Sequence, residues 1–135
     1  DIAAYDPAKD ARRFEAGTPN VPSLYAAQAG LKFLLEVGVE NAWRVSSELH
    51  SQLRAGILDM GGKCATPEGD DEHGPMLAVK TTDEHALVNA MAQDNVVVSS
   101  RDGNLRISPH FYNNSEDVDM ALRSIARNRH LLFTH

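Results

Sequence analysis

The dipeptide Asp102-Gly103 constrains the fold of this chain more than any other feature of its sequence. It stands between two short apolar segments, Val96–Val98 and Leu105–Ser108, and Asp-Gly is a preferred pair for a tight hairpin turn. Two apolar segments joined by such a turn run antiparallel and side by side. The sequence therefore predicts a β-hairpin at this point, and any fold assigned to the chain has to contain it.

Helical periodicity dominates the residues before this hairpin. A first helix is expected to open at Pro22 and Ser23 and to end at Gly38, and a second to run from about Asn41 to the glycine pair at 61 and 62. Each carries apolar residues on one face: Leu24, Ala27, Leu31, Leu34 and Leu35 in the first, and Val45, Leu49, Leu53 and Ile57 in the second. We expect these two stripes to pack against each other, and the polar residues 1–21 to form an arm or linker.

Two more strands and two more helices complete the pattern. Short strands are expected over Lys63–Thr66 and Met76–Thr81, and a helix from Asp83 to about Asp94. Asn114 or Ser115 is placed to cap a last helix, whose core stripe would be Val118, Leu122, Ile125 and Leu132. The sequence thus predicts an α+β fold over residues 22–135: two helices, then a β-β-α-β-β-α order, with helices covering a small, mostly antiparallel sheet.

Charge and composition narrow the classes of partner. The chain has 135 residues, enough for one domain, and a formal net charge of −6. An acidic surface disfavours nucleic acids and anionic membranes, so the expected partners are small molecules or proteins. No apolar run is long enough for a membrane helix, the first residues are too polar for a secretory signal, and one cysteine, Cys64, excludes an internal disulfide. These features favour a cytoplasmic location.

Arg106 interrupts an otherwise apolar strand. Leu105 and Ile107 alternate as a core face does, so Arg106 and Ser108 are expected to face the opposite side of the sheet. An arginine there can simply be a solvated residue on the wet face of a sheet. It can also be a rigidly held guanidinium that binds both oxygens of a carboxylate at once.

Three segments resemble a known family. They are RFEAGTPN at positions 13–20, YAAQAGLKFLLEVG at 25–38 and RISPHFYNNSEDVD at 106–119. They are similar to the C-terminal part of class V aminotransferase-like proteins, which are fold-type I enzymes that use pyridoxal phosphate and include cysteine desulfurases and isopenicillin N epimerase-like proteins. The resemblance covers nearly the whole chain. It implies a small domain of such an enzyme, which acts on an amino-acid substrate and forms a homodimer.

The same resemblance implies roles for Arg106, Gly17 and Thr18, and two further candidates lie near Arg106 in the sequence. An arginine in the strand before the Tyr-Asn turn binds the substrate α-carboxylate in such enzymes, and Arg106 stands in that place. Gly17 and Thr18 stand where the family reaches across a dimer to the partner's cofactor phosphate; taken without the resemblance, they indicate only a turn. Arg101 is a second, weaker candidate for the substrate site, and His110 is expected to line the same cleft or to pack in the turn.

The chain also departs from the family pattern. Its four lysines, Lys9, Lys32, Lys63 and Lys80, do not stand in the context of the lysine that forms a Schiff base with the cofactor. We therefore expect the large domain, with the catalytic residues, to be missing from this chain. Desulfurases carry a reactive cysteine between two strands, where this sequence has SSRDGN, so Cys64 is expected to be a small packed residue and desulfurase activity is disfavoured.

Two other interpretations remain open from the residues alone. The chain could be a free-standing α+β module that binds a small molecule through Arg106, or a dimerisation domain without a ligand. No metal site is expected, because the six histidines lack metal-binding spacing and only one cysteine accompanies them.

Overall fold

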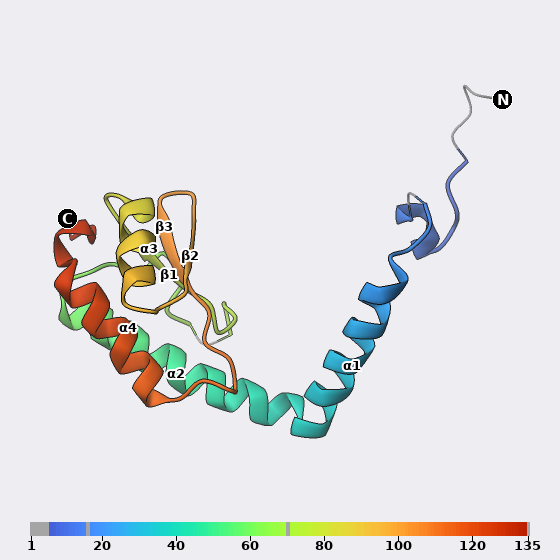
Figure 1. The fold of residues 1–135 in the computed structure, drawn as a ribbon, viewed down its shortest axis with the longest axis horizontal. Coiled ribbons are helices and arrows are strands. Elements are labelled where there is room, and N and C mark those ends of the chain that lie inside the picture. Colours follow the sequence, from blue (N-terminus) through green and yellow to red (C-terminus); the bar gives the residue numbers. More distant parts are fainter. Residues whose placement is uncertain (1–5, 16, 70, 135) are drawn as a thin grey trace. The chain divides into compact units, whose positions relative to one another are not determined.

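The computed structural model describes residues 6–15, 17–69 and 71–134 (Figure 1). The chain divides into two compact units, residues 1–37 and residues 38–135, and each is described by itself. Residues 1–5 and Ala16, which belong to the expected arm, lie outside the described residues. No helix of the described part is both long and apolar enough to cross a membrane.

The first unit contains a short 3-10 helix, η1 (Ala11–Phe14), and the helix α1 (Val21–Val37). Asp10 caps η1, since its carboxylate accepts a hydrogen bond from the backbone N–H of Arg12 at 3.0 Å. The side-chain oxygen of Asn20 accepts one from the N–H of Ser23 at the start of α1. No residue of α1 is buried, although most of them are apolar. This helix therefore has no core of its own.

The second unit is built on a three-stranded antiparallel sheet of order β1-β3-β2. Its strands are β1 (Leu77–Lys80), β2 (Ser99–Arg101) and β3 (Asn104–Ile107). Asp102 and Gly103 join β2 to β3 with φ angles of 52° and 76°. Two successive positive φ angles are typical of the primed hairpin turns, so the expected turn is confirmed, although the first strand of the hairpin is Ser99–Arg101 and not Val96–Val98.

Two of the expected strands are wrong. Lys63–Thr66 forms only an isolated bridge between Cys64 and Val79, because the Thr66 hydroxyl accepts the hydrogen bond of the Ala78 N–H at 2.8 Å and the segment then leaves the sheet. Val96–Val98 is not a strand either. If its register with β3 continued, Val96 would lie opposite Pro109, which has no N–H to donate. Two of the four predicted strands thus remain, and Ser99–Arg101, which follows the predicted Val96–Val98, supplies the third strand of the sheet.

Three helices pack together on the core side of the sheet, two of them against its strands and the last against those two helices (Figure 1). They are α2 (Val39–Asp59), α3 (Glu84–Gln93) and α4 (Ser115–Arg127), and a short 3-10 helix, η2 (Arg129–Leu131), follows α4. Asp83 caps α3, and Asn114 caps α4 in a capping box with Asp117, as the side-chain chemistry of both residues favours. The α+β class is confirmed.

The core of the second unit lies between these helices and the sheet. Its buried members come from the three helices, from β1 and β3, and from the segment after η2: Leu49, Leu53, Ile57, Leu77, Val79, Leu87, Met91, Leu105, Ile107, Val118, Ala121, Ile125 and Leu132. The apolar stripe of α2 packs against α4 and β1 within this unit, whereas the expected packing against the preceding helix concerns the other unit and stays a prediction. Leu132 belongs to the core but lies beyond α4, after η2.

Candidate functional site

The face of the sheet opposite the core carries the polar strand residues. Leu77, Val79, Leu105 and Ile107 are buried on the helix side, whereas the residues between them are partly buried or exposed. The register places Arg106 opposite Ala78 on one neighbouring strand and opposite Ser99 on the other. Arg106 is therefore held at the centre of this face, on the middle strand, which confirms its predicted orientation.

Arg106 has no partner within the described chain. It is partly buried, and none of its guanidinium nitrogens takes part in a hydrogen bond or ion pair with a residue in the described ranges. A guanidinium offers five N–H donors in a planar fork that suits a carboxylate. The arrangement leaves that fork available to a ligand.

Arg101 shares this face with Arg106. It ends β2 opposite Asn104, so it stands two residues along from Ser99, the direct neighbour of Arg106. Such diagonal positions have Cα atoms about 7–8 Å apart, within reach of long side chains. The structure thus places the two arginines that the sequence singled out on one surface.

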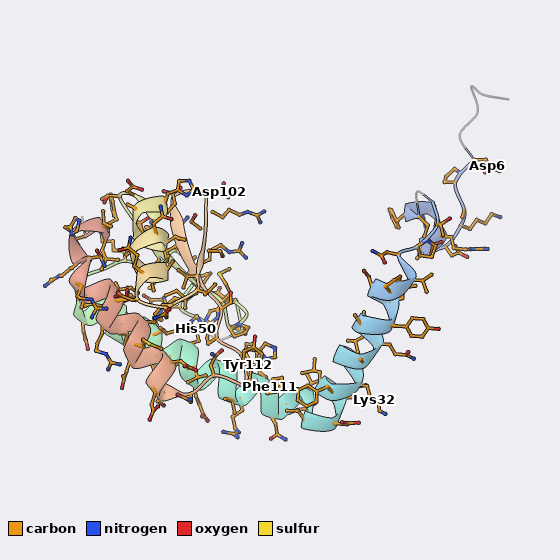
Figure 2. All side chains as sticks on the ribbon, in the orientation of Figure 1. Asp6, Lys32, His50, Asp102, Phe111 and Tyr112 are labelled. Atoms are coloured by element: carbon orange, nitrogen blue, oxygen red, sulfur yellow. The ribbon has the colours of Figure 1, made fainter. Side chains whose placement is uncertain are left out.

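His110 lies in the turn after β3 rather than on the sheet. Its backbone N–H donates to the side-chain oxygen of Asn113 at 2.9 Å, and its ring stacks on that of Tyr112 with centroids 4.9 Å apart. Figure 2 labels Tyr112 and its neighbour Phe111. The Nδ1 atom is buried and has no hydrogen-bond partner among the described residues. His110 therefore packs in the turn while one of its nitrogens stays unpaired.

An open hollow of about 690 Å³ adjoins this turn. Its walls are mainly apolar and include His110, Tyr112, Pro75 and Met76. Ala78, which lies directly opposite Arg106, and Ser108, two residues after Arg106, also line it. Two neighbours of Arg106 on the sheet, Ala78 and Ser108, thus line the hollow together with His110, while Arg106 itself is not part of its wall.

Lys63 and Lys80, which the sequence did not assign to the substrate site, also belong to this face. Lys80 lies opposite Asn104, and the backbone of Lys63 pairs with that of Lys80 through a 2.8 Å hydrogen bond. Alternation along β1 predicts that Lys80 lies on the non-core side, because Leu77 and Val79 face the core and Lys80 is the next residue after Val79. Nothing in the local sequence indicates that the face of Lys80 is also that of Arg106, since this depends on the pairing of β1 with β3.

Gly17 and Thr18 belong to the first unit and are exposed there. A Cβ atom built on Gly17 would meet nothing within 4 Å, so its surroundings would admit a close approach of another group. The Thr18 hydroxyl has no hydrogen-bond partner within the described residues. Both residues are thus open to solvent, and neither forms an enclosed site with the described residues of the first unit.

The rest of a pyridoxal phosphate site does not fit this chain. Lys9, Lys32, Lys63 and Lys80 are all exposed, so none stands in an enclosed pocket where a Schiff base would be protected from water. Cys64 is partly buried, and this burial raises the pKa of its thiol, against a smaller opposing effect of the Arg54 charge. The described residues contain no cluster of three or more His, Cys, Asp or Glu side chains that could hold a metal ion.

Comparisons with known proteins identify the family to which this chain belongs. A family model described as aminotransferase class-V matches residues 2–121. An uncharacterized aminotransferase of Bacillus subtilis, YcbU, is 30% identical over 88% of this chain and 32% of its own length. A Pyrococcus abyssi protein named "Probable cysteine desulfurase" is 23% identical over 90% of this chain and 34% of its own. The chain therefore spans about a third of the length of these relatives.

Solved structures share the fold. The apo structure of a cysteine desulfurase from Thermococcus onnurineus superimposes with a TM-score of 0.77, over 95% of this chain and 36% of that one. Its sequence is 20% identical, so this likeness concerns the fold and not the reaction.

Proposed function

Because the chain belongs to the class-V aminotransferase family, we propose that it is the C-terminal small domain of a pyridoxal-phosphate enzyme that acts on an amino acid. In this proposal residues 22–135 are the small domain and residues 1–21 an arm. The chain's share of its relatives' length, about a third, agrees with a domain of a longer enzyme. The active-site lysine then belongs to a large domain outside this chain.

Arg106 carries the proposal. Its side chain leaves the middle strand on the uncovered face, has no partner among the described residues, and adjoins the hollow lined by Ala78, Ser108 and His110. A fixed, permanently charged fork in such a place suits the α-carboxylate of an amino acid. Arg106 would orient the substrate, with Arg101 and His110 at the border of the same site.

The bound cofactor would supply an electron sink for carbanion chemistry at the substrate. Within this chain, Gly17 and Thr18 would reach the cofactor phosphate of a partner subunit, since the first offers an unobstructed backbone and the second a hydroxyl donor. Because all four lysines are exposed, the chain would bind and orient but would not perform the reaction alone.

The hairpin argues against desulfurase chemistry in the parent enzyme. β2 and β3 are joined by two residues, Asp102 and Gly103, so there is no loop between them to present a reactive thiol. The single cysteine, Cys64, bridges to Val79 at the edge of the sheet, and its burial raises its pKa, which lowers the fraction of reactive thiolate. The proposal therefore concerns other reactions of an amino acid.

A second function is favoured by one observation. Residues 38–135 form a compact unit with a core of their own, as an independent module would. In that case Arg106 would hold a carboxylate without catalysis, and no cofactor would be involved.

The experiment compares two ligands of the full-length enzyme, L-alanine and ethylamine, in wild type and Arg106→Ala. We expect the variant to bind L-alanine at least about tenfold more weakly, because a charge-assisted contact is lost, and to bind ethylamine unchanged. Arg123→Ala, which removes an exposed arginine of α4, is the control of equal charge.

Two results would contradict the proposal. One is a loss of folding in Arg106→Ala, seen as a large drop in melting temperature, which would make the residue structural. The other is an equal weakening of both ligands. A borohydride-trapped, stoichiometric cofactor adduct on one lysine of the 135-residue chain would instead refute the view that the chain is inactive alone.

A further inference from the structure

Four cations share the uncovered face of the sheet. Lys63, Lys80 and Arg101 lie in one row across the strands, with Asn104 between Lys80 and Arg101. Arg106 lies one row further along β3, diagonal to both Lys80 and Arg101 at about 7–8 Å between Cα atoms. Lys80, Arg101 and Arg106 therefore form a triangle around Asn104, and Lys63 extends it at the edge.

No negative side chain balances this triangle within the described strands. The other residues on the face are Ala65, Ala78, Asn104 and Ser99. None of the four cations has a side-chain hydrogen bond or an ion pair with a described residue. The chain has 19 acidic residues against 13 basic ones; Asp102 follows Arg101 in the hairpin turn, and Asp71 and Glu72 precede His73, which lines the hollow. A concentration of unpaired positive charge on an acidic chain marks a place that attracts anions.

We propose that this face selects amino acids with a second negative charge on the side chain. The inference rests on the proposed function: Arg106 takes the α-carboxylate, and Lys80 and Arg101 take the second acidic group. The diagonal spacing lets the three long side chains converge on a ligand of two carboxylates. The ligand's ammonium group is repelled by the row of cations and would point away from it, toward the side of the hollow.

The three cations together allow a selectivity among amino acids that one arginine cannot provide. A single guanidinium recognises any amino acid, because every amino acid carries the α-carboxylate. Discrimination between side chains needs a second contact that only some of them make. Lys80 and Arg101 are exposed, so their effect should be moderate and should decrease as salt is added.

The test uses the 135-residue chain labelled with ¹⁵N, and amide chemical shifts to measure weak binding. L-Glutamate and L-glutamine are the probes, since they have nearly the same shape and differ in the charge of the side chain. We expect glutamate to bind about fivefold more tightly at low ionic strength. In Lys80→Gln/Arg101→Gln this preference should disappear, so that the dissociation constants of glutamate and glutamine become nearly equal.

Two variants make the result specific. Arg123→Gln/Arg129→Gln removes the same charge from exposed positions on α4 and η2, outside the strands, and should keep the preference. Arg106→Gln should weaken both probes. Retention of glutamine binding with no preference for glutamate in wild type would overturn the inference and leave the role of Arg106 intact. Binding of neither probe, or binding unaffected by Arg106→Gln, would overturn both proposals.

Discussion

The helices α1 and α2 follow each other along the chain and differ in almost every physical respect. In α1 the apolar side chains lie on more than one side, and Leu24, Tyr25, Leu31 and Phe33 each expose more than half of their surface. In α2 the apolar residues are fewer, yet Leu53 and Ile57 are at most 1% exposed. Apolar content alone thus does not decide burial. What decides it is whether another element presents a complementary surface.

The two helices also illustrate different kinds of pattern. The stripe of α2 repeats at steps of four and faces α4 and β1, which supply that surface within the same unit. A helix that is apolar on most sides is typical of the interior of a larger assembly. Substitutions in α2 should therefore change the free energy of unfolding of the second unit, whereas matched substitutions in α1 should change it little.

The largest expected contrast comes from removing one leucine from each helix. Leu53→Ala should reduce the free energy of unfolding of the second unit by about 2–5 kcal/mol, because it leaves a cavity in the core. Leu31→Ala, at a position that is 61% exposed, should change it by less than about 0.5 kcal/mol. Urea denaturation followed by circular dichroism measures both. Equal losses would show that α1 also contributes to this core.

A pair of glycine substitutions sharpens the same contrast at smaller magnitude. A Cβ at Gly56 of α2 would come within 2.5 Å of the Leu122 side chain on α4, so Gly56→Ala should destabilise by about 1–3 kcal/mol. A Cβ at Gly30 of α1 meets nothing within 4 Å. Gly30→Ala should therefore stabilise the helical state of α1 by up to about 1 kcal/mol, because Ala has the higher helix propensity. Thermal melts and helical ellipticity separate the two effects. A neutral Gly56→Ala would mean that α2 and α4 pack less closely.

The smallest expected effect depends on pH. The Ser124 hydroxyl and Arg127 contact Asp94, each at 2.6 Å, and together they hold its pKa below the usual value of 3.8. A lowered pKa in the folded state means that Asp94 contributes stability above pH 3.8 and loses it as the pH falls further. Asp94→Asn should thus be less stable than wild type at neutral pH, and the difference should shrink in acid.

Asp10 provides the matched control in the first unit. Its pKa is also lowered, by hydrogen bonds from the side chain and backbone of Arg12, but it caps only the short helix η1. Asp10→Asn should leave the unfolding of the second unit unchanged at every pH. Urea midpoints of both variants at neutral and acid pH test this. If the difference in stability between wild type and Asp94→Asn did not depend on pH, the ionised carboxylate of Asp94 would not be its cause.

Local chemistry made several features predictable from the sequence. The hairpin follows from the positive φ angles that Asp102 and Gly103 adopt, and the start of α4 from the capping ability of Asn114. The orientation of Arg106 follows from alternation with Leu105 and Ile107. The structure confirms these placements, whereas the role of Arg106 as a carboxylate ligand stays a prediction, as do those of Gly17 and Thr18.

The errors share one physical origin, which is pairing between residues distant in sequence. Val96–Val98 has strand propensity, but the partner strand ends before Pro109 and offers no ladder to continue. Lys63–Thr66 leaves the sheet because the Thr66 hydroxyl takes a hydrogen bond that a strand would have made with its backbone. Strand propensity depends on the local sequence, whereas strand pairing depends on residues that are distant in the chain.

The sequence by itself determined the α+β class, the hairpin, the caps and the side of the sheet on which Arg106 stands. Each of these depends on residues a few positions apart, where backbone sterics and alternation act directly. Only the tertiary structure decided that α2 packs on α4 and that Lys80 and Arg101 join Arg106 on one face. Those results depend on the register of β1 and β2 on β3, because the strand register decides which side chains become neighbours across the sheet.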